Sequence, residues 1–324
     1  MVRLSVVAAA CVLATAVCAS ALGAGGIKPQ KPNAGAQGED ETFVTQVMKD
    51  VRPLLEKDKI QDAVQRVDRG IQNADTELQV FQLRMTNIRV LLAASLQGKV
   101  DEKMLRQQAQ ALLDESSGRR GERAYLIAGK VNAALGSYDR ATDLLEKYLD
   151  RYPEPPATEA RDYKRTHGQS HPRLMYRYLA RRMLDKVQMV GEQVPDFELA
   201  TLDGTSRTPE SYEGKVWLLN FWATWCEASR KELPNLRRLR LTHRDEFAIL
   251  GLSMDKTRDK LETFIAKYEI SWDQVHLEQG SIVPNRFSVQ SLPAMFLIDE
   301  EGTVQAVGVR GKRLRKKVKE LLND

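Results

Sequence analysis

The spacing of apolar residues predicts a helical region over residues 42–152. Apolar side chains recur there every three or four positions, as in Ala63, Val64, Val67 and Ile71. This period places them on one face of an amphipathic helix. Polar residues and glycines interrupt the pattern near 57–58, 75, 98, 118 and 136. We therefore expect about six helices of roughly 14 to 20 residues, packed in hairpin pairs.

The pattern changes after residue 191 to continuous apolar runs that alternate with amphipathic segments. The predicted strands cover residues 215–221, 247–254, 294–299 and 303–309. The predicted helices are one that ends at 241, one over 258–268 and one over 312–322. Glu300-Glu301-Gly302 forms the turn of a hairpin between the last two strands. Strands that alternate with helices and finish in a hairpin predict an α/β domain with a mixed sheet flanked by helices.

Residues 153–190 join these two regions. Their first part is polar and rich in proline, which predicts a linker, and a short basic helix is expected over 173–189. His167 and His171 lie four residues apart, a spacing that suits a metal on a helix. Because Gly168 and the loop-like composition argue against a helix there, we expect no metal and no cofactor.

The first residues have the pattern of a secretory signal peptide. Met-Val-Arg precedes an uncharged stretch over 4–22, which ends in the small residues Ala19-Ser20-Ala21. We assign residues 1–23 to the signal and 24–40, rich in glycine and proline, to a flexible linker. An exported protein of the periplasm or cell envelope is expected; an uncleaved N-terminal membrane anchor is the alternative.

The cysteine count and the net charge limit the kinds of site that this chain can form. The 324 residues include 3 cysteines, of which Cys11 and Cys18 fall in the predicted signal, so the exported chain keeps one thiol, Cys226. The net charge of +5 arises from 49 Lys and Arg against 44 Asp and Glu. Because acids and bases are interleaved and no nucleic-acid-binding motif accompanies them, we expect a solvated basic face and no nucleic-acid partner.

Part of the helical region resembles a tetratricopeptide repeat. The residues that carry the resemblance are Tyr125, Ala128, Gly129, Ala141, Leu145, Tyr148 and Pro153. Small residues at these spacings let two helices pack closely, and the proline ends the second helix. We therefore predict a tetratricopeptide-like domain over 41–152. Such arrays often present a concave surface to a partner protein, although a scaffold role is equally open.

The second region resembles the thioredoxin fold, and in particular the exported thiol–disulfide oxidoreductases of the TlpA/ResA type, which are grouped with the redoxins. The matching motifs are V-P-D-F at 194–197, L-D-G at 202–204, N-F-W-A-T-W-C at 220–226, Glu232 with Pro234, and L-P-A-M-F-L-I-D at 292–299. The resemblance covers roughly residues 191–324 and implies a thioredoxin fold there.

The resemblance places a reactive thiol at Cys226, where a strand ends and a helix begins. Free N–H groups and the helix dipole at such a junction stabilise a thiolate. Trp222 and Trp225 would form an apolar surround near the sulfur. By resemblance, Leu292-Pro293 is the cis-proline loop that lies against the cysteine, where its backbone would pair with an extended substrate.

This sequence departs from the family at the second cysteine. The family motif Cys-x-x-Cys reads Cys226-Glu227-Ala228-Ser229 here. Ser229 cannot cleave a mixed disulfide, although it could donate a hydrogen bond to the thiolate, so turnover would need an outside thiol. Glu227 would disfavour the thiolate. Glu232 matches an acidic position that the family places near the thiols, but a solvent-facing role is equally open.

Two functions follow from these residues. The first is a monothiol thiol–disulfide oxidoreductase that forms mixed disulfides through Cys226 with protein, peptide or small-thiol clients and requires no transmembrane partner. The second is a catalytically degenerate thioredoxin-fold and helical-repeat protein that serves as a binding module or scaffold. A peroxiredoxin is disfavoured, because Leu219 and Ala223 stand where that family's reactive-cysteine motif has proline and threonine.

Overall fold

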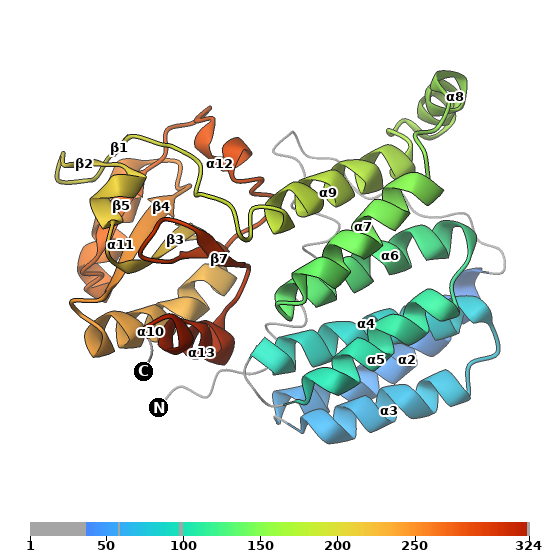
Figure 1. Cartoon of the computed structure of the whole chain (residues 1–324). Helices are drawn as coiled ribbons and strands as arrows, with labels where there is room; N and C mark the ends of the chain where they lie inside the picture. The colour runs from blue at the N-terminus through green and yellow to red at the C-terminus, as the bar shows by residue number, and fades with distance from the viewer. Residues whose placement is uncertain (1–36, 58, 97–99, 323–324) are drawn as a thin grey trace. The chain divides into compact units, whose positions relative to one another are not determined.

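The computed structural model describes residues 37–57, 59–96 and 100–322 (Figure 1). The chain divides into two compact units, Met1–Val131 and Asn132–Asp324. The predicted signal peptide over 1–23 and the linker up to residue 36 lie outside the described residues. Within the described ranges, no helix has both the length and the apolarity that a membrane span requires.

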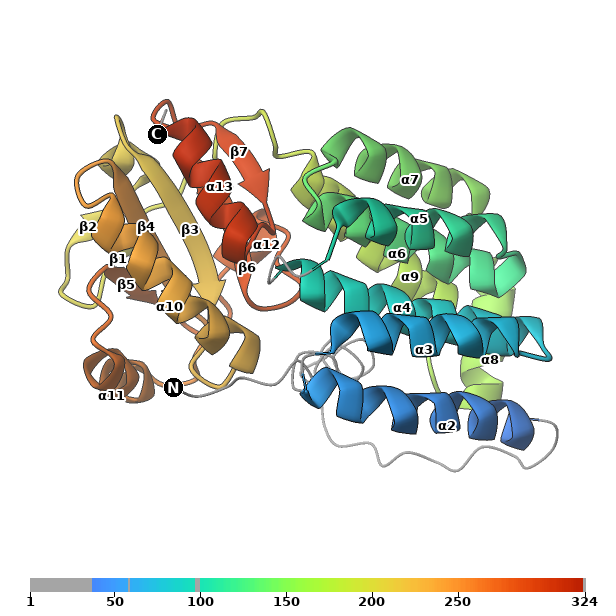
Figure 2. The same cartoon turned by 90° about the horizontal axis from the view of Figure 1, so that it is seen from below.

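The first unit is built from helices, which Figure 2 shows from below. They are α2 (Gln37–Glu56), α3 (Ile60–Gln72), α4 (Glu77–Leu96), α5 (Glu102–Asp114) and most of α6 (Gly118–Ala134). Each helix from α2 to α4 contacts the next one along the chain, and α2 also contacts α4. Three of the four apolar residues that the sequence period selected, Ala63, Val64 and Val67, lie on the buried face of α3, and the fourth, Ile71, is partly buried.

The second unit begins with three helices, α7 (Tyr138–Arg151), α8 (Ala157–His167) and α9 (Pro172–Val187). The predicted helices between 42 and 152 therefore exist as α2 to α7. The predicted domain end at residue 152 differs from the division at Val131, because α7 packs along α9 within the second unit. The tetratricopeptide resemblance stays a prediction, although Ala128, Ala141 and Tyr148 are buried.

The prediction of a linker over residues 153–172 is wrong in one respect, because this segment contains α8. Pro156 is the N-cap of α8, where a missing N–H costs nothing, and Gly168 ends the helix at φ 66. No residue of α8 is buried, so the helix leaves no apolar period in the sequence. The predicted basic helix over 173–189 is present as α9.

A five-stranded mixed sheet follows, in the order β5-β4-β3-β6-β7. Its strands are β3 (Val216–Trp222), β4 (Phe247–Ser253), β5 (Asp273–His276), β6 (Ala294–Ile298) and β7 (Val304–Val307). The β3–β4 and β4–β5 pairs are parallel, whereas β6 is antiparallel to both β3 and β7. The predicted mixed sheet is confirmed, and β3 is its fully buried central strand.

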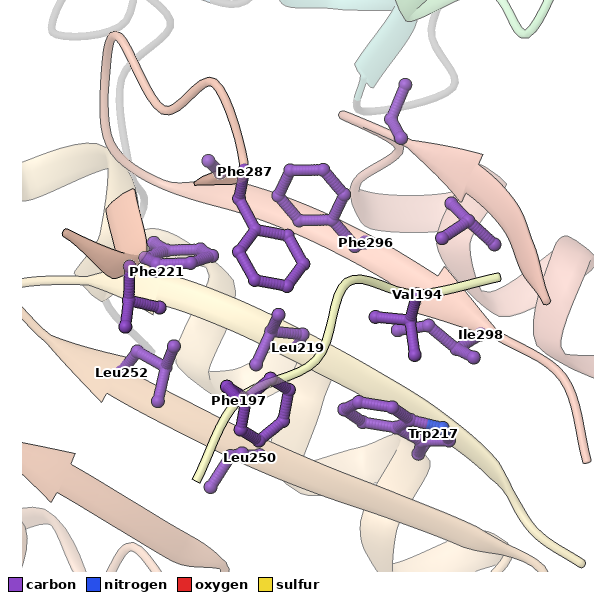
Figure 3. Close-up of a cluster of buried hydrophobic side chains, with 14 of the residues drawn as sticks. Val194, Phe197, Trp217, Leu219, Phe221, Leu250, Leu252, Phe287, Phe296 and Ile298 are labelled. Atoms are coloured by element: carbon purple, nitrogen blue, oxygen red, sulfur yellow. The ribbon is translucent and has the colours of Figure 1, made fainter. Parts of the chain in front are cut away.

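Helices and short elements surround this sheet. They are β1 (Leu199–Ala200), β2 (Ser206–Arg207), the 3-10 helix η1 (Pro209–Tyr212), α10 (Glu227–Thr242), α11 (Arg258–Tyr268), α12 (Val283–Arg286) and α13 (Gly311–Leu321). Side chains of β3 alternate between two apolar clusters. Trp217, Leu219 and Phe221 enter one cluster with Phe287 (Figure 3). The cluster on the other face is closed by side chains of α10, α11 and α13, including Leu236 and Leu314.

Candidate active site

Cys226 occupies the N-cap position of α10, one short loop after β3. Its φ of −83° and ψ of 109° are extended, and Arg230 N donates to its carbonyl oxygen at 3.1 Å to begin the helix. The thiol is partly buried and is the free cysteine of the described chain. The free N–H groups and dipole of this 16-residue helix favour negative charge on the sulfur.

The loop before β6 lies against this sulfur. The Cys226 thiol donates to the Leu292 carbonyl oxygen at an Sγ···O distance of 3.6 Å, and the Leu292–Pro293 peptide bond is cis. The antiparallel pairing of Phe221 with Ala294 brings this loop beside the end of β3. Two segments far apart in the sequence, both singled out by their motifs, therefore meet at one point.

Ser229 lies in the first turn of α10, at the position of the family's second cysteine. It is only 2% exposed, and within the described part of the chain its Oγ makes no hydrogen bond. The predicted hydrogen bond to Cys226 is thus absent while the sulfur bonds to Leu292. A buried hydroxyl without a partner costs about 1–3 kcal/mol, so this position carries unused hydrogen-bonding capacity.

Glu232 is anchored rather than turned freely to solvent. Its Oε2 accepts a hydrogen bond from Gly311 N at 3.2 Å and from Asn235 Nδ2 at 3.3 Å. The carboxylate therefore ties α10 to the first turn of α13. This position is partly buried, which disfavours the alternative of a purely solvent-facing glutamate.

Arg310 is a site residue that no sequence motif indicated. Its Nη2 donates to the Pro293 carbonyl oxygen at 2.6 Å. Burial lowers the pKa of the Arg310 guanidinium, whereas the charges of Glu232 and Cys226 act to raise it. The sequence groups Arg310 with the basic residues of the last helix. Its position directly after the apolar residues that follow β7 was the available signal that it points inward.

The two tryptophans have different environments. Trp222 is 1% exposed, its Nε1 donates to Gln274 Oε1 at 2.9 Å, and its ring lies 5.8 Å from that of Phe264. The side chain of Trp222 therefore belongs to the core beneath the loop, and its expected place in the apolar surround of the sulfur stays a prediction. Trp225 is 65% exposed and is available to a substrate.

A buried carboxylate fixes the loop that precedes Cys226. Asp255 is 3% exposed and accepts from Thr224 N at 3.0 Å, from Thr224 Oγ1 at 2.6 Å and from Ser253 Oγ at 2.8 Å. Asp255 follows β4, which is parallel to β3, so both loops lie at the same edge of the sheet. No sequence motif indicated Asp255, although an acid directly after a buried strand is a recognisable signal.

The charge beside the thiol is partly compensated. Glu227, the residue after Cys226, forms a salt bridge with Lys231 at 2.7 Å. This pairing weakens the expected effect of Glu227 against the thiolate.

No group of His, Cys, Asp and Glu within the described ranges is arranged to hold a metal ion. In α8 and after it, His167 stacks on Tyr163, and His171 Nε2 lies 3.2 Å from Glu159 Oε1.

The part of the chain that carries this site is similar to known proteins. Residues 190–307 match the model of the AhpC/TSA family. The thioredoxin-like protein YneN of Bacillus subtilis is 31% identical over 136 residues, which are 41% of this chain and 78% of YneN. A thiol-disulfide oxidoreductase ResA of Bacillus cereus is 32% identical over 122 residues, which are 37% of this chain and 70% of ResA.

A solved structure is similar as well. The thiol-disulfide oxidoreductase from Bacteroides fragilis NCTC 9343 is 32% identical and covers 40% of this chain and 99% of its own, with a TM-score of 0.38. The mixed sheet, the cysteine at the N-terminus of α10 and the loop at Leu292 define a thioredoxin-fold protein of the thiol–disulfide oxidoreductase class. The chain belongs to the redoxin family that includes YneN and ResA.

Proposed function

We propose that this protein is an exported thiol–disulfide oxidoreductase that works through one cysteine, Cys226. The observation that carries the proposal is the position of that thiol. It lies at the N-terminus of α10 and 3.6 Å from the Leu292 carbonyl oxygen, while the second cysteine of the family motif is replaced by the buried Ser229. A thiol so placed can attack a disulfide, and once the signal that carries Cys11 and Cys18 has been removed, no second thiol of the chain is left to resolve the product.

The first step forms a mixed disulfide. The Cys226 thiolate attacks one sulfur of a client disulfide, a Cys226–client S–S bond forms, the client S–S bond breaks, and the second client sulfur leaves as a thiolate that takes up a proton. An extended client segment would pair with the backbone at Leu292, where the neighbouring Pro293 has no N–H to donate. The clients are protein or peptide thiols and disulfides.

Export is part of the proposal. The segment 1–23 has the charge and hydropathy pattern of a signal peptide, which would direct the chain to the periplasm or cell envelope; an N-terminal anchor is the alternative. Disulfide clients are expected in such an oxidising compartment. The helices preceding the thioredoxin fold would then select the client or hold a partner protein.

The Cys-x-x-Ser sequence is also the observation that favours a second candidate, a binding protein whose redox chemistry has been lost. The rate of alkylation of Cys226 by iodoacetamide separates the two candidates. The mature protein would be titrated across pH, with Cys226→Ser as the matched blank. We expect the midpoint of the rate profile below about pH 7.5, whereas a midpoint near about 8.5, that of an ordinary thiol, would reject the redox function.

A further inference from the structure

An open pocket of about 470 Å³ lies beside the loop that carries Cys226. Thr224 and Trp225 form the wall nearest the cysteine, and residues of α10 and α11 complete it. Trp225 is 65% exposed and Tyr268 is 45% exposed, so two of the large apolar side chains exposed in the described chain gather at this pocket. A volume of this size is in the range of small-molecule sites.

The charge of the pocket is positive. Its lining includes Arg230, Lys260 and Lys267 against the single carboxylate of Asp259. Within the described chain neither Arg230 nor Lys260 forms an ion pair. Lys267 Nζ lies 5.5 Å from the centroid of the Tyr268 ring. Unpaired cations beside exposed aromatic faces suit a ligand that carries carboxylates on a short apolar or peptide frame.

We propose that this pocket binds the small thiol that resolves the mixed disulfide, a low-molecular-weight thiol carrying carboxylates. The proposal rests on the single-cysteine function above, because a protein that lacks an internal resolving thiol must take one from outside. Two lining residues flank Cys226, since Trp225 directly precedes it and Arg230 N donates to its carbonyl oxygen at 3.1 Å, so the pocket borders the segment that carries the sulfur. The Leu292 side of the sulfur remains available to the client.

The reaction balances with two molecules of this thiol. The first, as thiolate, attacks the mixed disulfide, forms an S–S bond with Cys226 and releases the client sulfur, which takes up a proton. The second attacks the disulfide so formed, releases the Cys226 thiol and leaves as the oxidised small disulfide. In sum, one client disulfide is reduced to two thiols, and two small thiols are oxidised to one disulfide.

The test runs the second exchange in reverse with defined probes. Reduced protein is mixed with glutathione disulfide, which is anionic, or with cystamine, which is cationic, and mass spectrometry follows the mixed disulfide at Cys226. Both rates are divided by the iodoacetamide rate of the same variant, which removes differences in intrinsic thiol reactivity. The variants are Lys260→Glu and Lys267→Glu, with Lys319→Glu on α13, outside the pocket lining, as the matched control.

We expect each pocket variant to lower the ratio of the glutathione disulfide rate to the cystamine rate by about three- to tenfold, and the control to leave it unchanged. Fast alkylation by iodoacetamide with the same ratio in all variants would overturn the pocket and leave the single-cysteine function standing. Slow alkylation together with no mixed disulfide from either probe would instead overturn the proposed function.

Discussion

Arg310 holds the carbonyl oxygen of Pro293 through a hydrogen bond of 2.6 Å from its Nη2. The guanidinium lies near the Glu232 carboxylate and interacts favourably with negative charge on Cys226. One cation thus connects the end of the sheet, the loop that would receive a client, and the thiol. Hydrogen bonds from charged donors are stronger than those between neutral groups, so this link fixes the loop that lies against the thiol.

Replacing Arg310 is therefore expected to lower the rate at which the Cys226 thiol is alkylated, without unfolding the protein. In Arg310→Met we expect alkylation at pH 7 to fall about three- to tenfold and the midpoint of the pH–rate profile to rise. Arg310→Lys, which keeps the charge, should recover most of the rate. Iodoacetamide kinetics across pH measure both, with the exposed Lys312→Met as control. If the Arg310→Met profile coincides with that of the natural chain, Arg310 has only a structural role.

Ser229→Cys is expected to create an activity that the natural chain lacks. Residue 229 lies one helical turn after Cys226, so a thiol there would attack the mixed disulfide from within the protein. We expect pre-reduced Ser229→Cys, mixed with insulin in the absence of any small thiol, to release free insulin thiols and end with a disulfide between residues 226 and 229, and the double variant with Cys226→Ser to be inactive. Comparable insulin reduction by the unmodified chain would disprove the single-thiol mechanism.

Ser229→Ala tests whether the buried hydroxyl serves the thiolate. Because its Oγ is buried without a hydrogen bond among the described residues, its removal should raise the free energy of unfolding by about 1–3 kcal/mol, the cost of the unpaired hydroxyl. Alkylation of Cys226 at pH 7 should nevertheless slow by about threefold, since the hydroxyl is available to donate once the thiol loses its proton. Urea unfolding and iodoacetamide kinetics measure the two effects. An unchanged alkylation rate would remove Ser229 from the mechanism.

Apolar periodicity predicted the elements that bury a face or a whole strand. The helix predicted over 258–268 is α11 with the same bounds, and the continuous apolar run at 215–221 is β3 to within one residue at each end. The periodicity gave no signal for α8, which buries no residue, or for β5, where the buried Gln274 and Val275 lie between the partly buried Asp273 and His276. Elements without a regular apolar face carry no periodic signal.

Some residues of the site could be predicted from the sequence and others could not. Cys226 and Leu292 were predicted because each belongs to a local motif. Arg310 and Asp255 were not predicted, since their roles depend on distant segments that only the folded sheet brings together. The burial of Trp222 was also decided by tertiary packing, because β3 alternates its side chains between two covered faces. A motif identifies which residues matter but not which face of the sheet each one serves.

Asp255→Asn is expected to loosen the loop before Cys226. The amide keeps one acceptor oxygen but loses the charge that strengthens the hydrogen bonds from Thr224 and Ser253, and its NH₂ group would be buried beside existing donors. We expect a loss of about 1.5–3 kcal/mol in the free energy of unfolding, measured with urea. Asp245→Asn, at an exposed position before β4, is the control. Equal stability of the Asp255→Asn variant and the natural chain would contradict the role of this network.

Tyr212 gives the fold a dependence on alkaline pH. Its hydroxyl donates to Asp273 Oδ2 at 3.1 Å, and its ring stacks on Trp217 with 4.7 Å between centroids. Burial and the Asp273 carboxylate raise the pKa of Tyr212 above its usual value. A folded-state pKa above the unfolded one stabilises the fold fully below about pH 10, and this contribution is lost as the pH rises further, because only the unfolded chain then releases the proton.

The measurement compares the natural chain with Tyr212→Phe, which cannot titrate at this position. Above about pH 10, we expect the difference in their free energies of unfolding to fall with a slope approaching about 1.4 kcal/mol per pH unit. Between about pH 7 and 9 the difference should be constant, since the phenol is neutral in both states. Urea titrations at intervals from about pH 7 to 11.5 give the curve, and the subtraction removes the other tyrosines and the lysines. A difference that stays constant over the whole range would show that Asp273 and burial do not hold the proton on Tyr212.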